Sequence, residues 1–277
     1  MKDVLPPAVS KWQFVEEKAR AVLESFAYRE LRSDGPLPRA YIAHGRWQAE
    51  PITRWYRFDH EGGRLEAAVF GAENASADAE LVAMAAGLLE EIGLPGGRRK
   101  LHVQASDEVL AVLSTMTVSY EAMSAPPLSF EVRAGEHRLA SGARTDGLLP
   151  SLGGPSVPVL MLAVDLEHVI AALDEPDENF EPPIIAFFAC DGPRARAWSV
   201  KTAHRLRLDG VRAEIGHDGA EVDEQRTRAA ALGARLAVVV REEDLHAGQV
   251  LVEDHGTDRR EIVSTEDLES TIRQRVD

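Results

Sequence analysis

The sequence predicts two domains of different fold class: an α+β domain built on antiparallel hairpins, then a smaller α/β domain with a mixed sheet. In residues 1–173, strand-like segments occur in pairs around glycine turns, which is the pattern of antiparallel hairpins. In residues 184–277, apolar strands alternate with helices, which predicts an α/β sandwich. The acidic, proline-rich segment 174–183 separates the two patterns, and we interpret it as the linker between the domains.

Composition is that of a globular protein without membrane spans. The chain has 277 residues, of which 44% are hydrophobic and 28% charged. No apolar run approaches the length of a membrane span, and the N-terminus lacks the apolar core of a signal peptide, so we expect a cytoplasmic protein. The single cysteine, Cys190, excludes an internal disulfide, and the nine histidines show no metal-ligand spacing, so we expect no metal site.

The net charge of −15 argues against nucleic acid as a partner, and both predicted domains are acidic. A polyanion such as tRNA would be repelled at long range unless a local basic patch overcame the field. One modest basic face exists on the predicted helix Trp198–Leu208, which carries Lys201, Arg205 and Arg207. Binding of tRNA is therefore disfavoured but left open.

Periodicity and turn residues assign the elements of the first domain. The predicted helices are 12–26, 39–44, 79–92 with a cap at Ser76–Asp78, and 106–113 with Ser106 as cap. The predicted strands are 28–32, 51–58, 64–70, 101–103, 128–134, 137–143 and 157–164. Glycine turns at Gly62-Gly63 and Gly135-Glu136 make two hairpins of these strands.

The second domain reads as strands and helices in alternation, followed by a strand pair and a last helix. The predicted strands are 184–190, 211–215, 236–240, 249–254 and 260–263, and the predicted helices are 193–208, 222–232 and 266–275. Gly210 and Gly233 lie just past the first two helices, as expected for helix ends.

Three short motifs carry a family resemblance. They are the turn Arg144-Thr145-Asp146-Gly147-Leu148, the segment Leu152-Gly153-Gly154-Pro155, and the strand end Asp165-Leu166-Glu167-His168. In this order they resemble the histidyl-tRNA synthetases, which are class II synthetases, and their non-catalytic paralogues. The second domain resembles the anticodon-binding domain of that family, mainly through Asp223-Glu224-Gln225 and Val240–Leu245.

The resemblance implies a class II antiparallel sheet, a homodimer formed through the first helix and strand, and a remnant pocket for ATP and an amino acid. Arg57 matches the arginine that grips the α-phosphate, Glu73 matches an acid near the amino group, and Arg144 opens the conserved turn. Each residue also has a plainer interpretation. Arg57 would pair with Glu66, Arg144 and Asp146 would hold the turn, and Glu73 would be solvated.

The residues that differ from the family pattern stand at positions expected to contact ATP and at positions expected to contact histidine. His168 replaces an arginine, Thr145 replaces a tyrosine, and Ala67 and its neighbours offer no ring for adenine. A carboxylate of Asp165 facing the pocket would repel phosphate by about 4 kcal/mol at a separation of roughly 4 Å. The histidine-binding Arg-Gly-Leu-Asp segment and the family's helical insertion are absent, so we assign no catalytic residue.

The first hypothesis is therefore a shortened, degenerate paralogue without aminoacylation activity. It would act as a binding or regulatory protein for an unidentified protein or small ligand, and it would need no cofactor. A second is an enzyme that still activates some carboxylate with ATP and Mg²⁺ through Arg57. A third is a regulatory subunit of the ATP phosphoribosyltransferase type in histidine biosynthesis, although such regulators usually lack the C-terminal domain.

Overall fold

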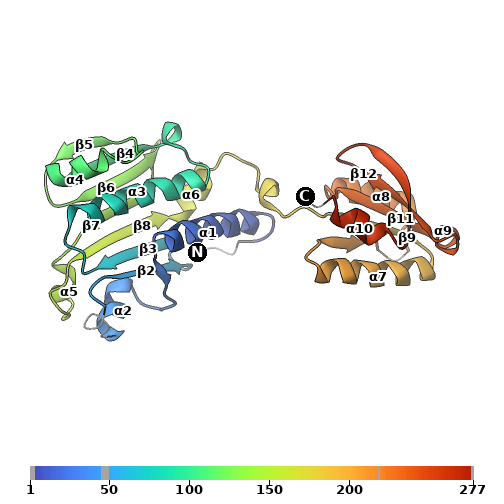
Figure 1. Cartoon of the computed structure of the whole chain (residues 1–277), viewed down its shortest axis with the longest axis horizontal. Coiled ribbons are helices and arrows are strands. Elements are labelled where there is room, and N and C mark those ends of the chain that lie inside the picture. The colour runs from blue at the N-terminus through green and yellow to red at the C-terminus, as the bar shows by residue number, and fades with distance from the viewer. Residues whose placement is uncertain (1–3, 45–49, 218, 276–277) are drawn as a thin grey trace. The chain divides into compact units, whose positions relative to one another are not determined.

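A computed structural model describes residues 4–44, 50–217 and 219–275 (Figure 1). The chain forms two compact units, residues 1–181 and residues 182–277, which are described separately. The boundary lies inside the acidic, proline-rich segment 174–183. Within the described ranges, no helix is both long enough and apolar enough to cross a lipid bilayer.

The first unit is built on one sheet whose strand order is β1-β2-β3-β8-β7-β6-β4-β5. The strands are β1 (Arg29–Glu30), β2 (Thr53–Asp59), β3 (Arg64–Phe70), β4 (Lys100–Ala105), β5 (Glu121–Ser124), β6 (Ser129–Ala134), β7 (His137–Arg144) and β8 (Val159–Asp165). The six central strands pair antiparallel, as the hairpins predicted, and the edge strands β1 and β5 pair parallel to their neighbours.

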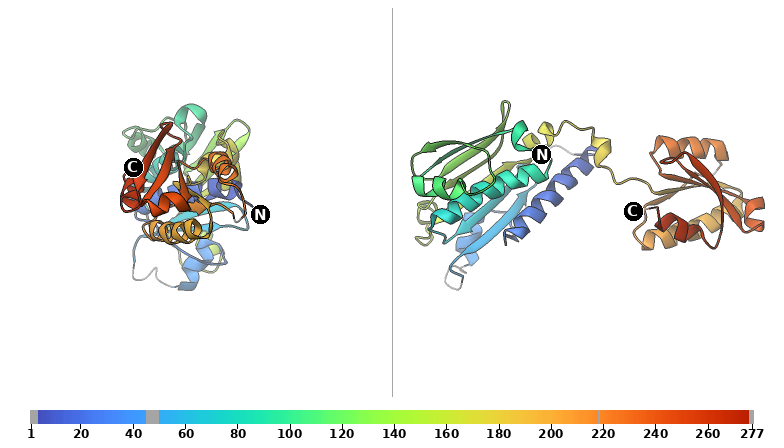
Figure 2. Two further views of the ribbon diagram at one scale, coloured as in Figure 1. Left: turned by 90° about the vertical axis from the view of Figure 1, so that its right-hand side faces the viewer. Right: turned by 45° about the horizontal axis from the view of Figure 1, so that its top comes forward.

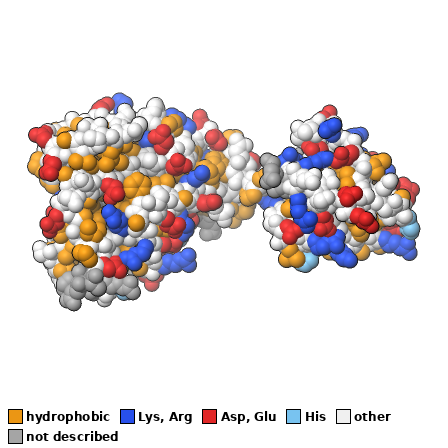
Figure 3. Space-filling view, viewed as in Figure 1, with side chains coloured by type: hydrophobic (Ala, Val, Ile, Leu, Met, Phe, Trp, Pro, Cys, Tyr) orange, Lys and Arg blue, Asp and Glu red, His pale blue; other side chains and the backbone are white. Residues whose placement is uncertain are grey.

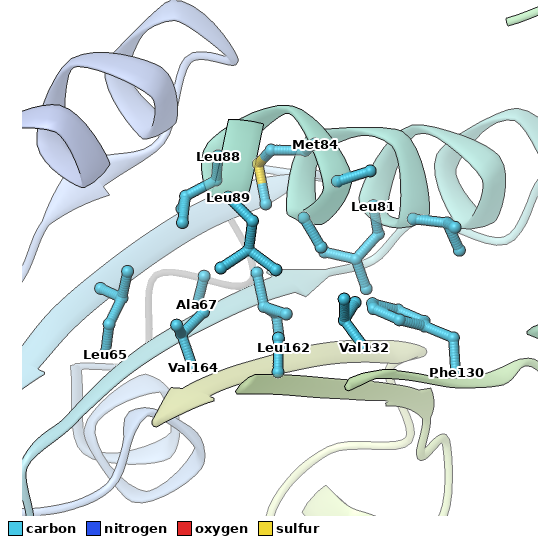
Figure 4. Close-up of a cluster of buried hydrophobic side chains, with 14 of the residues drawn as sticks. Leu65, Ala67, Leu81, Met84, Leu88, Leu89, Phe130, Val132, Leu162 and Val164 are labelled. Atoms are coloured by element: carbon cyan, nitrogen blue, oxygen red, sulfur yellow. The ribbon is translucent and has the colours of Figure 1, made fainter. Parts of the chain in front are cut away.

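Helices cover one face of this sheet, where α1 and α3 run side by side (Figure 2). The helices of the unit are α1 (Ala8–Ser25), α2 (Leu37–His44), α3 (Ala75–Glu91), α4 (Asp107–Leu113), α5 (Leu148–Ser151) and α6 (Leu166–Ala172). The predicted periodicity of the third helix is confirmed. Leu88 points toward Leu65 of the sheet and Leu81 toward Val132, and both helix residues are almost fully buried (Figure 4).

The opposite face of the sheet is only partly covered, and we call it the open face. Near its β2–β3 end, Tyr41 of α2 stacks on Phe70 with ring centroids 4.0 Å apart, and Trp55 and Leu149 complete this second cluster. Elsewhere the strands present polar side chains on this face. The first unit therefore has a continuous core on the helix side and room for a ligand on the other side.

Three local predictions were wrong or incomplete. Helix α3 begins at Ala75 rather than Ala79, because the Asn74 side chain caps it by accepting a hydrogen bond from the Ala77 amide at 2.8 Å. Strand β5 and helix α5 were missed, since each has four residues, too few for a hydrophobic period. All four residues of β5 are exposed, and only its pairing with β4 defines it as a strand.

The second unit confirms the predicted mixed sheet, with strand order β10-β9-β11-β12-β13. Its strands are β9 (Ala186–Asp191), β10 (Ala213–Ile215), β11 (Leu236–Arg241), β12 (Gln249–Asp254) and β13 (Arg259–Ser264), and its helices are α7 (Pro193–Leu208), α8 (Val222–Ala231), α9 (Glu242–His246) and α10 (Leu268–Arg273). Strands β9 and β11 are apolar up to their last residues, Asp191 and Arg241, because helices bury both of their faces. The five-residue α9 was not predicted.

Lys11, a residue that the sequence gave no reason to single out, holds the start of the connector against α1. Its side chain is buried, and Nζ donates to the carbonyl oxygens of Leu173 and Glu175, both at 2.8 Å. The ring of Phe180 lies 5.3 Å from the Lys11 nitrogen and 5.0 Å from the ring of Phe14. The segment 173–180 is therefore packed onto the first unit rather than being a free linker along its whole length.

We expect Lys11→Met to destabilise the first unit by about 2 kcal/mol, because two carbonyl groups lose a charged donor while the apolar stem is kept. Urea unfolding measures the free energy, and hydrogen exchange of residues 174–180 reports local release. Lys18→Met is the matched control on the same helix, since Lys18 lies over the ring of Phe14 and makes no such carbonyl bonds. Equal unfolding midpoints for the two variants would contradict this assignment.

Candidate functional site

Arg57, the candidate phosphate ligand, is enclosed by acidic side chains on the open face. Its Nε donates to Glu66 at 2.7 Å, one of its terminal nitrogens donates to Asp59 at 3.4 Å, and the other donates to the Ser33 carbonyl. Only 8% of the residue is exposed. The hydrogen bond with Glu66 and its charge raise the pKa of Arg57, so the cation is stable and already neutralised by protein carboxylates. This confirms the pairing with Glu66 that the sequence allowed.

The strand register places Arg57 in one row across the whole open face. Following the pairs from strand to strand, the row reads Arg57, Glu66, Ala163, Ser141, Glu131, His102 and Glu121. It contains three carboxylates and a single arginine. A groove of ≈ 550 Å³ lies over its β4–β7 end. This row is therefore acidic, which opposes a triphosphate above it.

Arg144 lies in a different row, and its side chain points to the helix side of the sheet. Its row partners Leu160 and Val69 belong to the helix-side core. The guanidinium donates to both oxygens of Asp78 in α3, to the Ala72 carbonyl at 3.0 Å and to Asp146 at 3.3 Å. Burial lowers the pKa of Arg144, but the hydrogen bonds and charges of Asp78 and Asp146 outweigh it and raise that pKa.

The third candidate, Glu73, lies in the loop between β3 and α3. It is exposed and makes no hydrogen bond or ion pair with the residues that the structure describes. Asp146 has a clear structural role, because its carboxylate also accepts the amide of Val159 at 3.0 Å and so fastens the turn to β8. Arg57 and Arg144 therefore leave opposite faces of the sheet, and Glu73 follows Ala72, whose carbonyl accepts a hydrogen bond from Arg144.

The expectation for Asp165 needs correction. Its carboxylate does not face a phosphate pocket: it caps helix α6 by accepting the His168 amide at 3.0 Å. The His168 ring lies with Nδ1 3.0 Å from the Arg138 carbonyl and packs against the ring of His137, with centroids 5.0 Å apart. Asp165 and His168 thus stabilise the start of the helix, and the predicted repulsion of phosphate by Asp165 has no support in this geometry.

The predicted basic face of α7 is largely occupied by internal partners. Arg205 forms an ion pair with Glu269 at 2.5 Å, and Arg207 donates twice to the Ala213 carbonyl. In Figure 3, basic side chains over α7 lie next to acidic ones. Lys201 has no hydrogen bond or ion pair with other described residues. Most of the expected basic patch therefore stabilises the fold.

No cluster of metal ligands is found among the described residues, since nowhere do three His, Cys, Asp or Glu side chains group together. Cys190 is buried in the second unit. On the open face, Arg57 is the only arginine in its row, which also carries three carboxylates. This row can contribute to a small-molecule site, but it supplies only one of the cations that nucleotide chemistry uses.

Comparisons with known proteins agree with this architecture. The family profile described as "Anticodon binding domain" matches residues 191–275. The histidine–tRNA ligase of Caldanaerobacter subterraneus is 23% identical over 407 aligned positions, covering 98% of each chain. That of Bacillus velezensis is 33% identical over 133 positions, which are 46% of this chain and 31% of the ligase.

Solved structures give the same result at the level of the fold. The apo histidyl-tRNA synthetase of S. aureus superposes with a TM-score of 0.87 at 19% identity, covering 98% of both chains. A structure from Bacillus halodurans, titled an ATP phosphoribosyltransferase regulatory subunit/histidyl-tRNA synthetase, has a TM-score of 0.67 at 11% identity, covering 87% of this chain and 96% of that chain.

The first unit therefore has the sheet of a class II aminoacyl-tRNA synthetase, joined to a second unit of the anticodon-binding class. The chain is similar to histidyl-tRNA synthetases over almost its whole length, as its motifs predicted. It is also shorter than its relatives: 407 aligned positions exceed the 277 residues here by 130, so at least that many positions have no counterpart.

We expect Arg144→Met to cost about 3–5 kcal/mol of unfolding free energy, because it leaves the carboxylate of Asp78 buried without its partner. The double variant Asp78→Leu/Arg144→Met should recover most of this loss. Arg54→Met is the control, since Arg54 occupies the same row but pairs with the more exposed Glu80. A loss at Arg144 no larger than that at Arg54 would show that the buried pair is not a structural anchor.

Proposed function

We propose that the chain is a non-adenylating relative of the histidyl-tRNA synthetases that acts as a binding or regulatory protein. The observation that carries this proposal is the pairing of Arg57 with Glu66 and Asp59 on the open face. An arginine stabilises a reacting phosphate only if its positive charge is available to the negative charge that develops on the phosphate oxygens. Here two carboxylates already hold that charge, and no second arginine stands in the same row.

The geometry also supports the absence of a cofactor requirement. Binding Mg²⁺–ATP would place an anionic triphosphate above a row that carries Glu66, Glu131 and Glu121. Arg144, the other candidate cation, points to the opposite side of the sheet and pairs with Asp78. Displacing either arginine from its carboxylate would leave an uncompensated acid, which costs free energy that ATP binding would have to supply.

A regulatory role of the ATP phosphoribosyltransferase type is the more specific candidate, and one comparison favours it. The B. halodurans structure carries that regulatory title, and its match covers 87% of this chain. That share is larger than residues 1–181 alone can provide, so the similarity reaches into the second unit. This weakens the expectation that a C-terminal domain argues against such a role.

Size-exclusion chromatography with the catalytic phosphoribosyltransferase of the same organism tests the regulatory role. Elution as a complex supports that role, and separate elution rejects it.

We further propose a homodimer formed through α1 and β1 and a cytoplasmic location, both on the basis of the family resemblance. Binding of tRNA through the second unit is a weaker candidate, because Arg205 and Arg207 are engaged within the fold. Mass measured by light scattering tests the dimer, and the salt dependence of any tRNA binding tests whether phosphate contacts contribute.

The direct test of lost catalysis is amino-acid-dependent exchange of pyrophosphate into ATP, with histidine and then with the other amino acids. We expect exchange at the level of a heat-inactivated sample in every case. The alternative, an ATP-dependent enzyme of altered specificity, predicts exchange that disappears in Arg57→Ala. Exchange with that dependence on Arg57 would overturn the proposed function.

A second prediction concerns the ion pair itself. Glu66→Gln keeps the shape of the side chain and removes the charge that neutralises Arg57, so the affinity for ATP should rise about fivefold, equivalent to about 1 kcal/mol. Calorimetry measures this change, and Glu66→Gln/Arg57→Ala serves as the control in which no rise is expected. An unchanged affinity in Glu66→Gln would show that Glu66 is not what weakens nucleotide binding.

A further inference from the structure

A second groove, of ≈ 600 Å³, lies on the helix side of the first unit and is separate from the open face. We call it the α3 groove. One wall is α3, and the other is the segment Met116–Ser119 that follows α4. Its lining residues are Ala83, Ala86, Gly87, Glu90, Gly96, Arg99, Leu101, Met116, Thr117, Val118 and Ser119. The groove therefore has one basic and one acidic side chain among mostly apolar groups.

Arg99 is the unusual member of this lining. Only 6% of its side chain is exposed, yet it has no buried acidic partner. One terminal nitrogen donates to the Ala86 carbonyl at 2.5 Å, and the other lies 3.3 Å from Glu90, whose side chain is 63% exposed. An ion pair with so exposed a carboxylate contributes little, so most of the desolvation of this guanidinium is not repaid.

The other buried arginines of the first unit differ in this respect. Glu66 beside Arg57 has a side chain that is 19% exposed, and Asp78 beside Arg144 one that is 9% exposed. Burial lowers the pKa of Arg99, and the charge of Glu90 offsets this only in part, whereas the pKa values of Arg57 and Arg144 are raised. Among the described residues of this unit, Arg99 is the buried cation whose charge is least compensated.

The rest of the lining offers space and donors. A side-chain carbon added at Gly87 or Gly96 would meet nothing within 4 Å, so both positions open onto free volume. Thr117 and Ser119 have hydroxyl groups that make no hydrogen bond with the described residues. Leu101, Met116 and Val118 supply apolar surface. A buried cation, free hydroxyl donors and an apolar wall together match a ligand with an acidic head and an apolar body.

We propose that the α3 groove binds a small organic anion, a carboxylate or phosphate monoester on an apolar body, with its acidic group on Arg99. The ligand replaces Glu90 as the partner of the guanidinium, and its apolar part lies along Met116 and Val118. This site does not depend on the function of the open face, so its failure would leave the proposed function untouched.

The test is calorimetric titration of the whole chain with hexanoate and hexyl phosphate, compared with the uncharged hexanol and the cationic hexylamine. The anions should bind saturably and at least tenfold more tightly than either comparator. Arg99→Met should lower their affinity at least tenfold, while Arg98→Met, at the neighbouring exposed position, should not. Glu90→Gln should raise the affinity, because it removes the competing carboxylate.

Gly87→Leu fills the groove at a helix position where a side chain is sterically free, so it should abolish binding without loss of fold. Circular dichroism and thermal unfolding confirm that each variant is folded. The proposal is overturned if neither anion binds, if hexanol binds as tightly as hexanoate, or if folded Gly87→Leu binds as well as the original chain.

Discussion

The ion pair between Arg57 and Glu66 connects the sheet geometry to the proposed loss of catalysis. The two residues face each other across the β2–β3 hairpin on the open face, with Nε and the carboxylate 2.7 Å apart. The register that pairs them also aligns Glu131 and Glu121 further along the same row. The cation that a nucleotide needs and the carboxylates that oppose it are therefore fixed by the same strand pairing.

The same alternation explains why a shared motif does not imply a shared pocket. Arg144 opens the family's motif turn, but its row is offset from that of Arg57 by three positions along each strand. Because this offset is odd, the two side chains leave opposite faces of the sheet. Arg144 then serves the fold through Asp78, and Asp165 does so by capping α6. Both polar residues, which belong to motifs shared with the family, therefore stabilise local structure in this chain.

The sequence predicted those structural features that residues close together in the chain determine, and it missed those that depend on contacts between distant residues. The buried stripe of α3, the apolar strands β9 and β11 and the two hairpins follow from periodicity and glycine turns within a few residues. The contacts of Lys11 with Glu175 and of Arg144 with Asp78 span 164 and 66 positions, and no local pattern contains them. The motif resemblance predicted the fold through the whole chain. It carried no information on side-chain direction, and so could not show that Arg57 and Arg144 leave opposite faces of the sheet.

A crystal structure determined after soaking with ATP, Mg²⁺ and histidine tests the central claim most directly. We predict that Arg57 stays paired with Glu66 at a hydrogen-bonding distance and that the open face shows no ordered triphosphate. An ordered triphosphate on that face, with the guanidinium of Arg57 turned from Glu66 to the α-phosphate, would contradict the account.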